Sequence, residues 1–111
     1  MTSPSRRLPF LLEQTSRAGA DPFAWYGLAL EYKQLGRVED ALATFQHLRA
    51  SHPEYLPMYL MCGQMLAGAE RLGEAKLWLA QGVALARAQG ESHALRELEG
   101  ALQQLSANEE L

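Results

Sequence analysis

The chain has 111 residues, 48% of them hydrophobic and 21% charged, a balance typical of one globular domain and unlike that of a disordered chain. The formal net charge of −3 leaves no basic surplus to neutralise phosphates, which disfavours a nucleic-acid partner. Cys62 is the sole cysteine, so an internal disulfide is excluded, as suits a reducing compartment.

The N-terminal segment carries two arginines followed by the apolar run Leu8 to Leu12, which superficially resembles an export signal. The run stops at Glu13, short of the roughly 7–15 apolar residues that such a signal needs. No segment approaches the roughly 20 apolar residues that span a bilayer. The sequence therefore predicts an N-terminal helix over residues 8–18 of a cytoplasmic protein with no membrane partner.

A pair of helices is predicted over residues 22–53. Asp21 followed by Pro22 is a strong helix start, because aspartate caps a helix and proline fits its first position. Gly36 can take the left-handed conformation that ends a helix, and Pro53 blocks continuation of the second one. Apolar residues recur at helical spacing on one face of each helix and form the expected core: Trp25, Leu28, Ala29, Tyr32, Ala41, Phe45 and Leu48.

The same pattern returns 34 residues later, over residues 56–89. Small residues pair across the two helices in both copies, at positions where a bulky side chain would overpack a close crossing. These pairs are Ala29 with Ala41, and Gly63 with Ala75. The repetition indicates one structural unit used twice. The matching apolar positions of the second copy are Tyr59, Cys62, Gly63, Leu66, Ala75 and Leu79.

The second copy departs from the first at its turn and at its end. Glu70 replaces the turn glycine, so we expect the turn to close with Gly68 or Gly73 instead. The final proline is also missing, so the second helix is expected to run to Gln89 and stop at Gly90.

Partial copies flank the two repeats. Leu95, Leu98 and Leu102 match the first helix of a third copy, and Glu99 occupies its small-residue position. A carboxylate is costly in a tight helix crossing, so residues 92–105 are expected to form a capping helix with a polar outer face. At the other end, Leu8 and Leu11 match the second helix of a preceding copy.

The spacing resembles that of the tetratricopeptide repeat family, whose signature is W-x₂-L-G-x₂-Y, A-x₃-F and a closing proline. Ala29 stands where glycine is usual, and Leu48 where alanine is usual. The resemblance implies an all-α fold, a right-handed α-solenoid of two helical hairpins between the N-terminal helix and the capping helix, in a single domain over residues 1–111. It points to small stand-alone bacterial members of the family. The positions that carry it are Trp25, Leu28, Tyr32, Ala41, Phe45 and Pro53.

Catalytic and metal-binding patterns are missing from the sequence. His47 and His52 do not share a helix face, and no H-E-x-x-H or phosphate-binding loop occurs. Cys62 lies on a core-facing position and is interpreted as a small hydrophobe. We therefore expect no enzyme activity, no metal and no cofactor.

The repeat fold implies a concave groove lined by the first helix of each hairpin. An apolar groove with cationic flanks suits a segment of another protein, so the predicted function is a protein–protein interaction module, an adaptor or scaffold. The alternatives are a structural homodimer that uses the same face, or a regulatory subunit of an enzyme encoded elsewhere. The predicted groove residues are Phe23, Tyr26, Leu30, Lys33, Leu60, Met61, Gln64 and Arg96.

Overall fold

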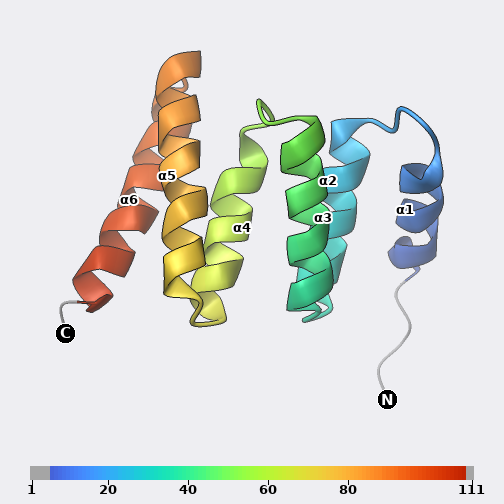
Figure 1. The fold of residues 1–111 in the computed structure, drawn as a ribbon, viewed down its shortest axis with the longest axis horizontal. Helices are drawn as coiled ribbons and strands as arrows, with labels where there is room; N and C mark the ends of the chain where they lie inside the picture. The colour runs from blue at the N-terminus through green and yellow to red at the C-terminus, as the bar shows by residue number, and fades with distance from the viewer. Residues whose placement is uncertain (1–5, 110–111) are drawn as a thin grey trace. The chain divides into compact units, whose positions relative to one another are not determined.

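The computed structural model describes residues 6–109 and contains α-helices but no strands within that range (Figure 1). This confirms the predicted all-α class of helical repeats. The helices fall into two compact units, the first ending at Tyr55 and the second beginning at Leu56. We call them unit 1 and unit 2. Their helices are α1 (Arg7–Ser16), α2 (Pro22–Gln34) and α3 (Val38–Ser51) in unit 1, and α4 (Pro57–Gly68), α5 (Leu72–Gln89) and α6 (Ser92–Glu109) in unit 2.

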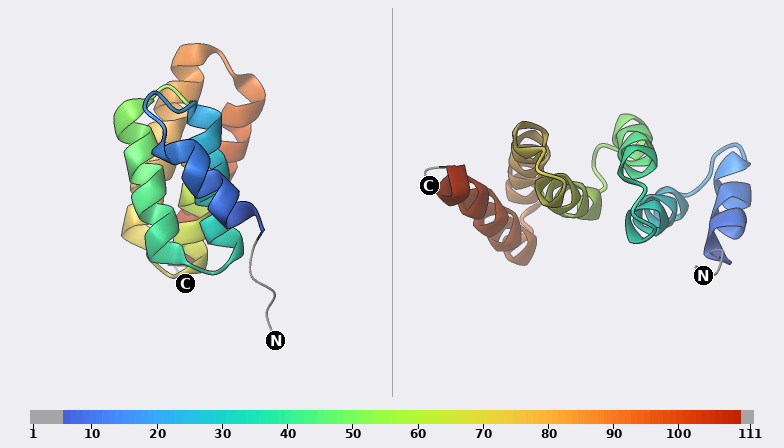
Figure 2. Two further views of the ribbon diagram at one scale, coloured as in Figure 1. Left: turned by 90° about the vertical axis from the view of Figure 1, so that its right-hand side faces the viewer. Right: turned by 90° about the horizontal axis from the view of Figure 1, so that it is seen from below.

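In unit 1, α2 packs against both α1 and α3 (Figures 1 and 2). The start of α2 is as predicted, because the Asp21 carboxylate accepts a hydrogen bond of 2.8 Å from the Phe23 amide. Ala29 and Ala41 are both fully buried, which confirms the close crossing of α2 and α3. The core of this hairpin comprises Leu28, Ala29, Ala41, Leu42, Phe45 and Leu48.

Trp25 corrects one expectation about the core of unit 1. Its side chain is only partly buried, and its ring lies against that of His47 at a centroid distance of 4.0 Å. Phe45, by contrast, has no exposed surface. The anchor of the hairpin is therefore the phenylalanine of α3, because the larger indole ring sits at the margin of the crossing.

In unit 2, α5 packs against both α4 and α6, and glycines mark two close approaches. A Cβ atom at Gly63 would lie 2.6 Å from Leu79, which confirms the predicted crossing of α4 and α5. Gly82 was not singled out by the sequence, yet a Cβ there would lie 2.7 Å from both Leu98 and Tyr59. Gly82 therefore lets α5 approach α4 and α6 together.

The turn between α4 and α5 differs from the prediction. Neither Gly68 nor Gly73 takes a positive φ; Glu70 itself does, at 62°, close to the 76° of Gly36 in the equivalent turn of unit 1. In both turns this residue donates its amide to a carbonyl three residues earlier, at 3.1 and 3.0 Å. The next residue donates to a carbonyl five residues earlier, at 2.9 Å in both. The geometry of the turn is thus kept although the glycine is lost.

The helix α6 has the predicted capping role within unit 2, although it runs to Glu109 and not only to residue 105. Leu98 and Leu105 are buried against the unit, whereas Glu99 is exposed and lies 3.5 Å from the Arg87 guanidinium. The end of α5 is also as expected, because Gly90 caps it with a φ of 69°. Of the helices described, none is both long enough and apolar enough to cross a membrane.

Candidate functional site

The four predicted groove residues of unit 1 all lie on α2, but they differ in environment. Phe23 is 71% exposed, whereas Tyr26, Leu30 and Lys33 are partly buried. Tyr26 packs against the ring of Tyr55 at a centroid distance of 5.3 Å. Burial and, secondarily, the neighbouring Tyr55 raise the pKa of Tyr26. Tyr26 is therefore part of the packing of unit 1, and Phe23 is the aromatic side chain open to contact.

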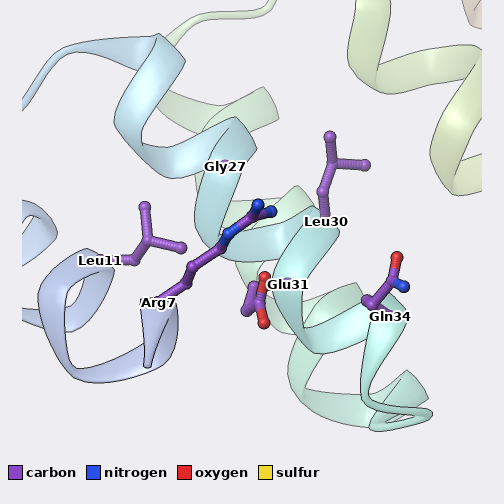
Figure 3. A pocket seen from close by; sticks show the side chains of 6 residues that line it. All are labelled: Arg7, Leu11, Gly27, Leu30, Glu31 and Gln34. Atoms are coloured by element: carbon purple, nitrogen blue, oxygen red, sulfur yellow. The ribbon is translucent and has the colours of Figure 1, made fainter. Parts of the chain in front are cut away.

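A furrow runs between α1 and α2 and contains two adjoining hollows. The first has a volume of about 340 Å³ and lies toward the C-terminal end of α2. Figure 3 shows Arg7 reaching from α1 across this hollow toward α2, from which Glu31 also extends. Its lining residues are Arg7, Leu11, Gly27, Leu30, Glu31 and Gln34.

The second hollow, of about 280 Å³, lies toward the N-terminal end of α2. It shares Leu11 and Gly27 with the first, so the two hollows adjoin each other along the crossing of α1 and α2. Phe10 of α1 is 61% exposed and lines it together with Phe23. We call the surface formed by both hollows the α1–α2 furrow. The second hollow is lined by Phe10, Leu11, Gln14, Asp21, Phe23, Ala24 and Gly27.

The floor of the furrow depends on a glycine. A Cβ atom at Gly27 would lie 3.3 Å from the Leu11 methyl carbon, so the missing side chain lets α1 approach α2 closely at this point. Away from this contact, α1 buries little: Thr15 is its only fully buried residue among those described. The open furrow follows from this single close approach of a short helix.

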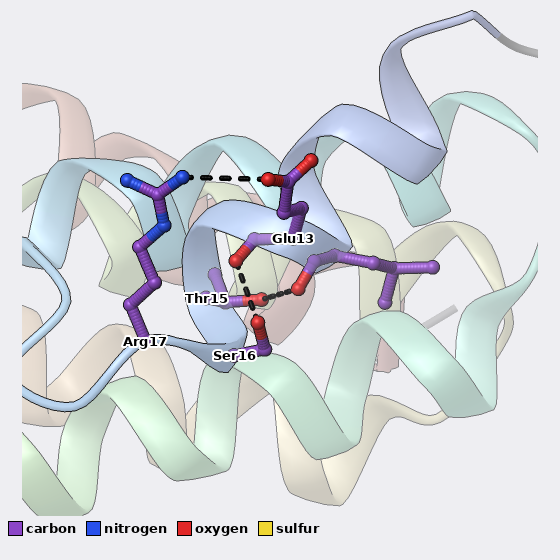
Figure 4. Close-up of polar contacts among 5 residues, drawn as sticks. Glu13, Thr15, Ser16 and Arg17 are labelled. Atoms are coloured by element: carbon purple, nitrogen blue, oxygen red, sulfur yellow. Dashed lines mark hydrogen bonds and ion pairs between the residues drawn. The ribbon is translucent and has the colours of Figure 1, made fainter.

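The polar groups at the C-terminal end of α1 already have partners (Figure 4). Glu13 lies 3.3 Å from the Arg17 guanidinium, and the hydroxyl groups of Thr15 and Ser16 donate to carbonyls of their own helix at 2.9 and 2.7 Å. At the other end, Arg6 and Arg7 make no ion pair within the described part of the chain. The two arginines lie beside Glu31, Gln34 and Leu35.

The other four predicted residues belong to unit 2. Leu60 and Met61 of α4 are partly buried, while Gln64 of α4 and Arg96 of α6 are exposed. Whether they act together with the α2 residues stays a prediction. Sequence reasoning missed Arg7, Phe10 and Leu11 as surface groups, because α1 was interpreted only as a packing helix. The signal lay in Arg6 and Arg7, which stand at the start of a helix without an acidic first turn.

Among residues 6–109, no group of three or more His, Cys, Asp or Glu side chains could hold a metal ion. Cys62, the sole cysteine of the chain, is fully buried. The surface features are instead apolar side chains, a furrow and a basic end. Together with paired helices repeated along the chain, they define a helical-hairpin repeat protein of the kind that holds other proteins.

Comparison with solved structures specifies the family. A crystal structure of a tetratricopeptide repeat domain protein from Salinibacter ruber matches with 32% identity and a TM-score of 0.72, over 78% of this chain and 97% of that one. A solution structure of such a protein from the same organism matches with 31% identity and a TM-score of 0.76, over 85% and 95%. The solution structure of a Bordetella parapertussis protein shares the fold at 21% identity, with a TM-score of 0.78 over 97% and 91%.

The chain belongs to the tetratricopeptide repeat family. No family model matches it, and no curated protein matches it. Members of this family are in general modules for protein–protein interaction, and the chain is a module of this general kind. The repeat interpretation from six spaced residues is thereby confirmed.

Proposed function

We propose that this protein is an adaptor without catalytic activity that acts in the cytoplasm and binds a segment of another protein through an apolar surface on α2. The observation that carries the proposal is the α1–α2 furrow, where Phe23 is 71% exposed beside Phe10 at 61%. Large aromatic side chains left open beside a hollow usually mark an interaction surface, because their burial supplies binding energy.

The roles proposed for the α2 residues follow their environments. Phe23 and Leu30 line the furrow and supply apolar contact, while Lys33 supplies a cationic flank. Tyr26 supports the packing of α2 through its contact with Tyr55. The proposed contribution of Leu60, Met61, Gln64 and Arg96 needs variants of its own in the same assay. No cofactor, metal or nucleic acid enters this function.

The test compares captured partners across three proteins, each immobilised and exposed to extract of the native cell. We expect wild type and Leu77→Ala to recover the same proteins, and a Phe23→Ala, Leu30→Ala double variant to lose them. Leu77 is a matched control, since it is 64% exposed but lies on α5 in unit 2.

Thermal melts must show that the double variant stays folded. A folded double variant that recovers the wild-type set of proteins would exclude α2 as the binding surface. Sedimentation equilibrium without ligand distinguishes the adaptor from the homodimer, because only the homodimer alternative requires the free protein to be a dimer.

A further inference from the structure

The α1–α2 furrow has the dimensions of a site for a helix. Its lining residues on α2 run from Phe23 to Gln34, which at a rise of about 1.5 Å per residue spans about 17 Å, or three helical turns. The two hollows of about 340 and 280 Å³ adjoin at the contact of Leu11 with Gly27, two residues that line both. A helix packs its ridge of side chains into a groove of this form.

The charges of the furrow differ between its two ends. Arg7 and Glu31 line the furrow at one end, and Arg6 lies beside them just outside its lining. The three side chains together carry one net positive charge. Asp21 is the only charged residue that lines the hollow at the other end. A chain with a net charge of −3 thus places a pair of arginines beside its open apolar surface.

These arginines are unfavourable for α1 itself. A helix N-terminus carries a partial positive charge and favours acidic residues, yet Arg6 is the N-cap residue of α1 and Arg7 begins it. No acidic residue lies in the first turn, and no side chain caps it. The basic pair therefore does not stabilise α1 through the helix dipole, and it makes no ion pair among the described residues.

We infer that the furrow receives an amphipathic helix of a partner protein, whose acidic first turn lies against Arg6 and Arg7 and whose apolar side chains contact Phe10 and Phe23. This inference rests on the proposed function and names the chemistry of the partner. Acidic residues at the N-terminal turn suit the dipole of the partner helix. The partner helix then runs in the direction of α1 and antiparallel to α2.

A second copy of this chain fits the furrow less well. Within the described residues, the helices α3 and α5 do begin with acidic turns, but Asp40 is bound to Arg37 at 2.8 Å and Glu74 to Arg71 at 2.7 Å. A lipid surface also fits less well, because the aromatic groups line a furrow that contains the carboxylates of Asp21 and Glu31. A helix from another protein meets both the shape and the charges.

Two synthetic helical peptides of about 15 residues test this inference. They share composition and a leucine stripe, but one has glutamates in the first turn and lysines in the last, and the other has the reverse order. By fluorescence anisotropy we expect the acid-first peptide to bind the full chain about tenfold more tightly, with a ratio that falls as salt rises. Arg7→Glu should abolish or invert the preference, Phe23→Ala should weaken both peptides about tenfold, and Leu77→Ala should change neither.

Four outcomes overturn the inference. Equal affinity of wild type for the two peptides, or no binding of either, would exclude an acidic first turn of the partner helix against Arg6 and Arg7. The adaptor function would still stand if the Phe23→Ala, Leu30→Ala double variant no longer captures proteins from extract. Affinity unchanged in a folded Phe23→Ala variant removes the furrow as the site. Binding to vesicles of phosphatidylcholine with phosphatidylglycerol that Phe10→Ala abolishes would assign the surface to membranes. Self-association in sedimentation velocity that Phe23→Ala abolishes would assign it to a second copy.

Discussion

Phe45 and Trp25 occupy signature positions of the same repeat but contribute differently to its stability. Phe45 is fully buried, so Phe45→Ala should lower the free energy of unfolding by about 3–5 kcal/mol through the cavity that it leaves. Trp25→Ala should cost clearly less, because the indole is partly exposed and contacts His47. Urea unfolding curves of both variants measure this difference. A Trp25→Ala variant less stable than Phe45→Ala would show that the indole is the anchor after all.

Tyr26 and Tyr55 make the stability of unit 1 sensitive to alkali. Burial, and then the neighbouring Tyr55, raise the pKa of Tyr26; burial, and then Asp21, raise the pKa of Tyr55. A raised folded-state pKa means that the neutral phenol is favoured in the fold. Its contribution is complete below the unfolded-state pKa of about 10 and is lost as pH rises through the folded-state value.

We therefore expect the free energy of unfolding to fall as pH rises above about 10, and to fall less steeply in Tyr26→Phe. Denaturant midpoints at a series of alkaline pH values give the two slopes. Tyr32→Phe is a suitable control, because Tyr32 is also a partly buried residue of α2, but its ring lies against the Arg37 guanidinium at 4.8 Å. Identical slopes for wild type and Tyr26→Phe would mean that the phenol is equally accessible in the folded and unfolded chains.

At the scale of elements, the turn between α4 and α5 is formed against the preference of its residue. Glu70 has a φ of 62°, a left-handed conformation that costs a residue with a Cβ atom about 1 kcal/mol. Glu70→Gly should therefore raise the free energy of unfolding by roughly that amount, and Gly36→Ala should lower it at the equivalent turn of unit 1. Thermal and urea melts of the two variants give the sign of each change in the free energy of unfolding. A destabilised Glu70→Gly variant would show that the glutamate side chain compensates for the strain of its backbone.

Two helical glycines provide a second test of how the elements pack. A Cβ atom at Gly82 would lie 2.7 Å from both Leu98 and Tyr59. A Cβ atom at Gly100 would meet no other atom within 4 Å. Gly100→Ala should stabilise the protein by roughly 0.5–1 kcal/mol through helix propensity. Gly82→Ala should destabilise it despite the same gain in propensity, because α5 must move away from its neighbours. Equal effects of both substitutions would contradict the close approach at Gly82.

At the scale of the whole molecule, α6 closes unit 2 and its removal should act on that unit. Leu98 and Leu105 bury their side chains in unit 2 only, so a chain of residues 1–91 exposes the apolar groups that they cover. Hydrogen exchange should show lost protection in α4 and α5 of this fragment, with more protection kept in α2 and α3. Wild-type protection throughout α4 and α5 would show that α6 is dispensable to the core.

The sequence by itself determined the repeat, because the repeat depends on local helix signals and on apolar and small residues at periodic positions. Helix starts such as Asp21-Pro22, the stop at Gly90, and the small residues Ala29 and Gly63 reflect backbone and packing requirements that recur 34 residues apart. The all-α class, the paired helices and the family all followed from these positions. A signature of this kind encodes which side chains must be small or apolar, and packing permits few other arrangements.

Tertiary structure alone decided which apolar residues are core and which are surface. Trp25 and Phe45 have equal weight in the pattern, but only Phe45 is fully buried, whereas Trp25 is partly exposed beside His47. The turn at Glu70 is kept by backbone hydrogen bonds, which cannot be predicted from the side chains of the turn. Phe10 and Phe23 face a common furrow because α1 folds back on α2 and touches it closely at Gly27, a contact between residues 16 apart in the sequence. Local periodicity gives the apolar face of each helix, whereas a surface for a partner depends on how much of that face the next helix leaves uncovered.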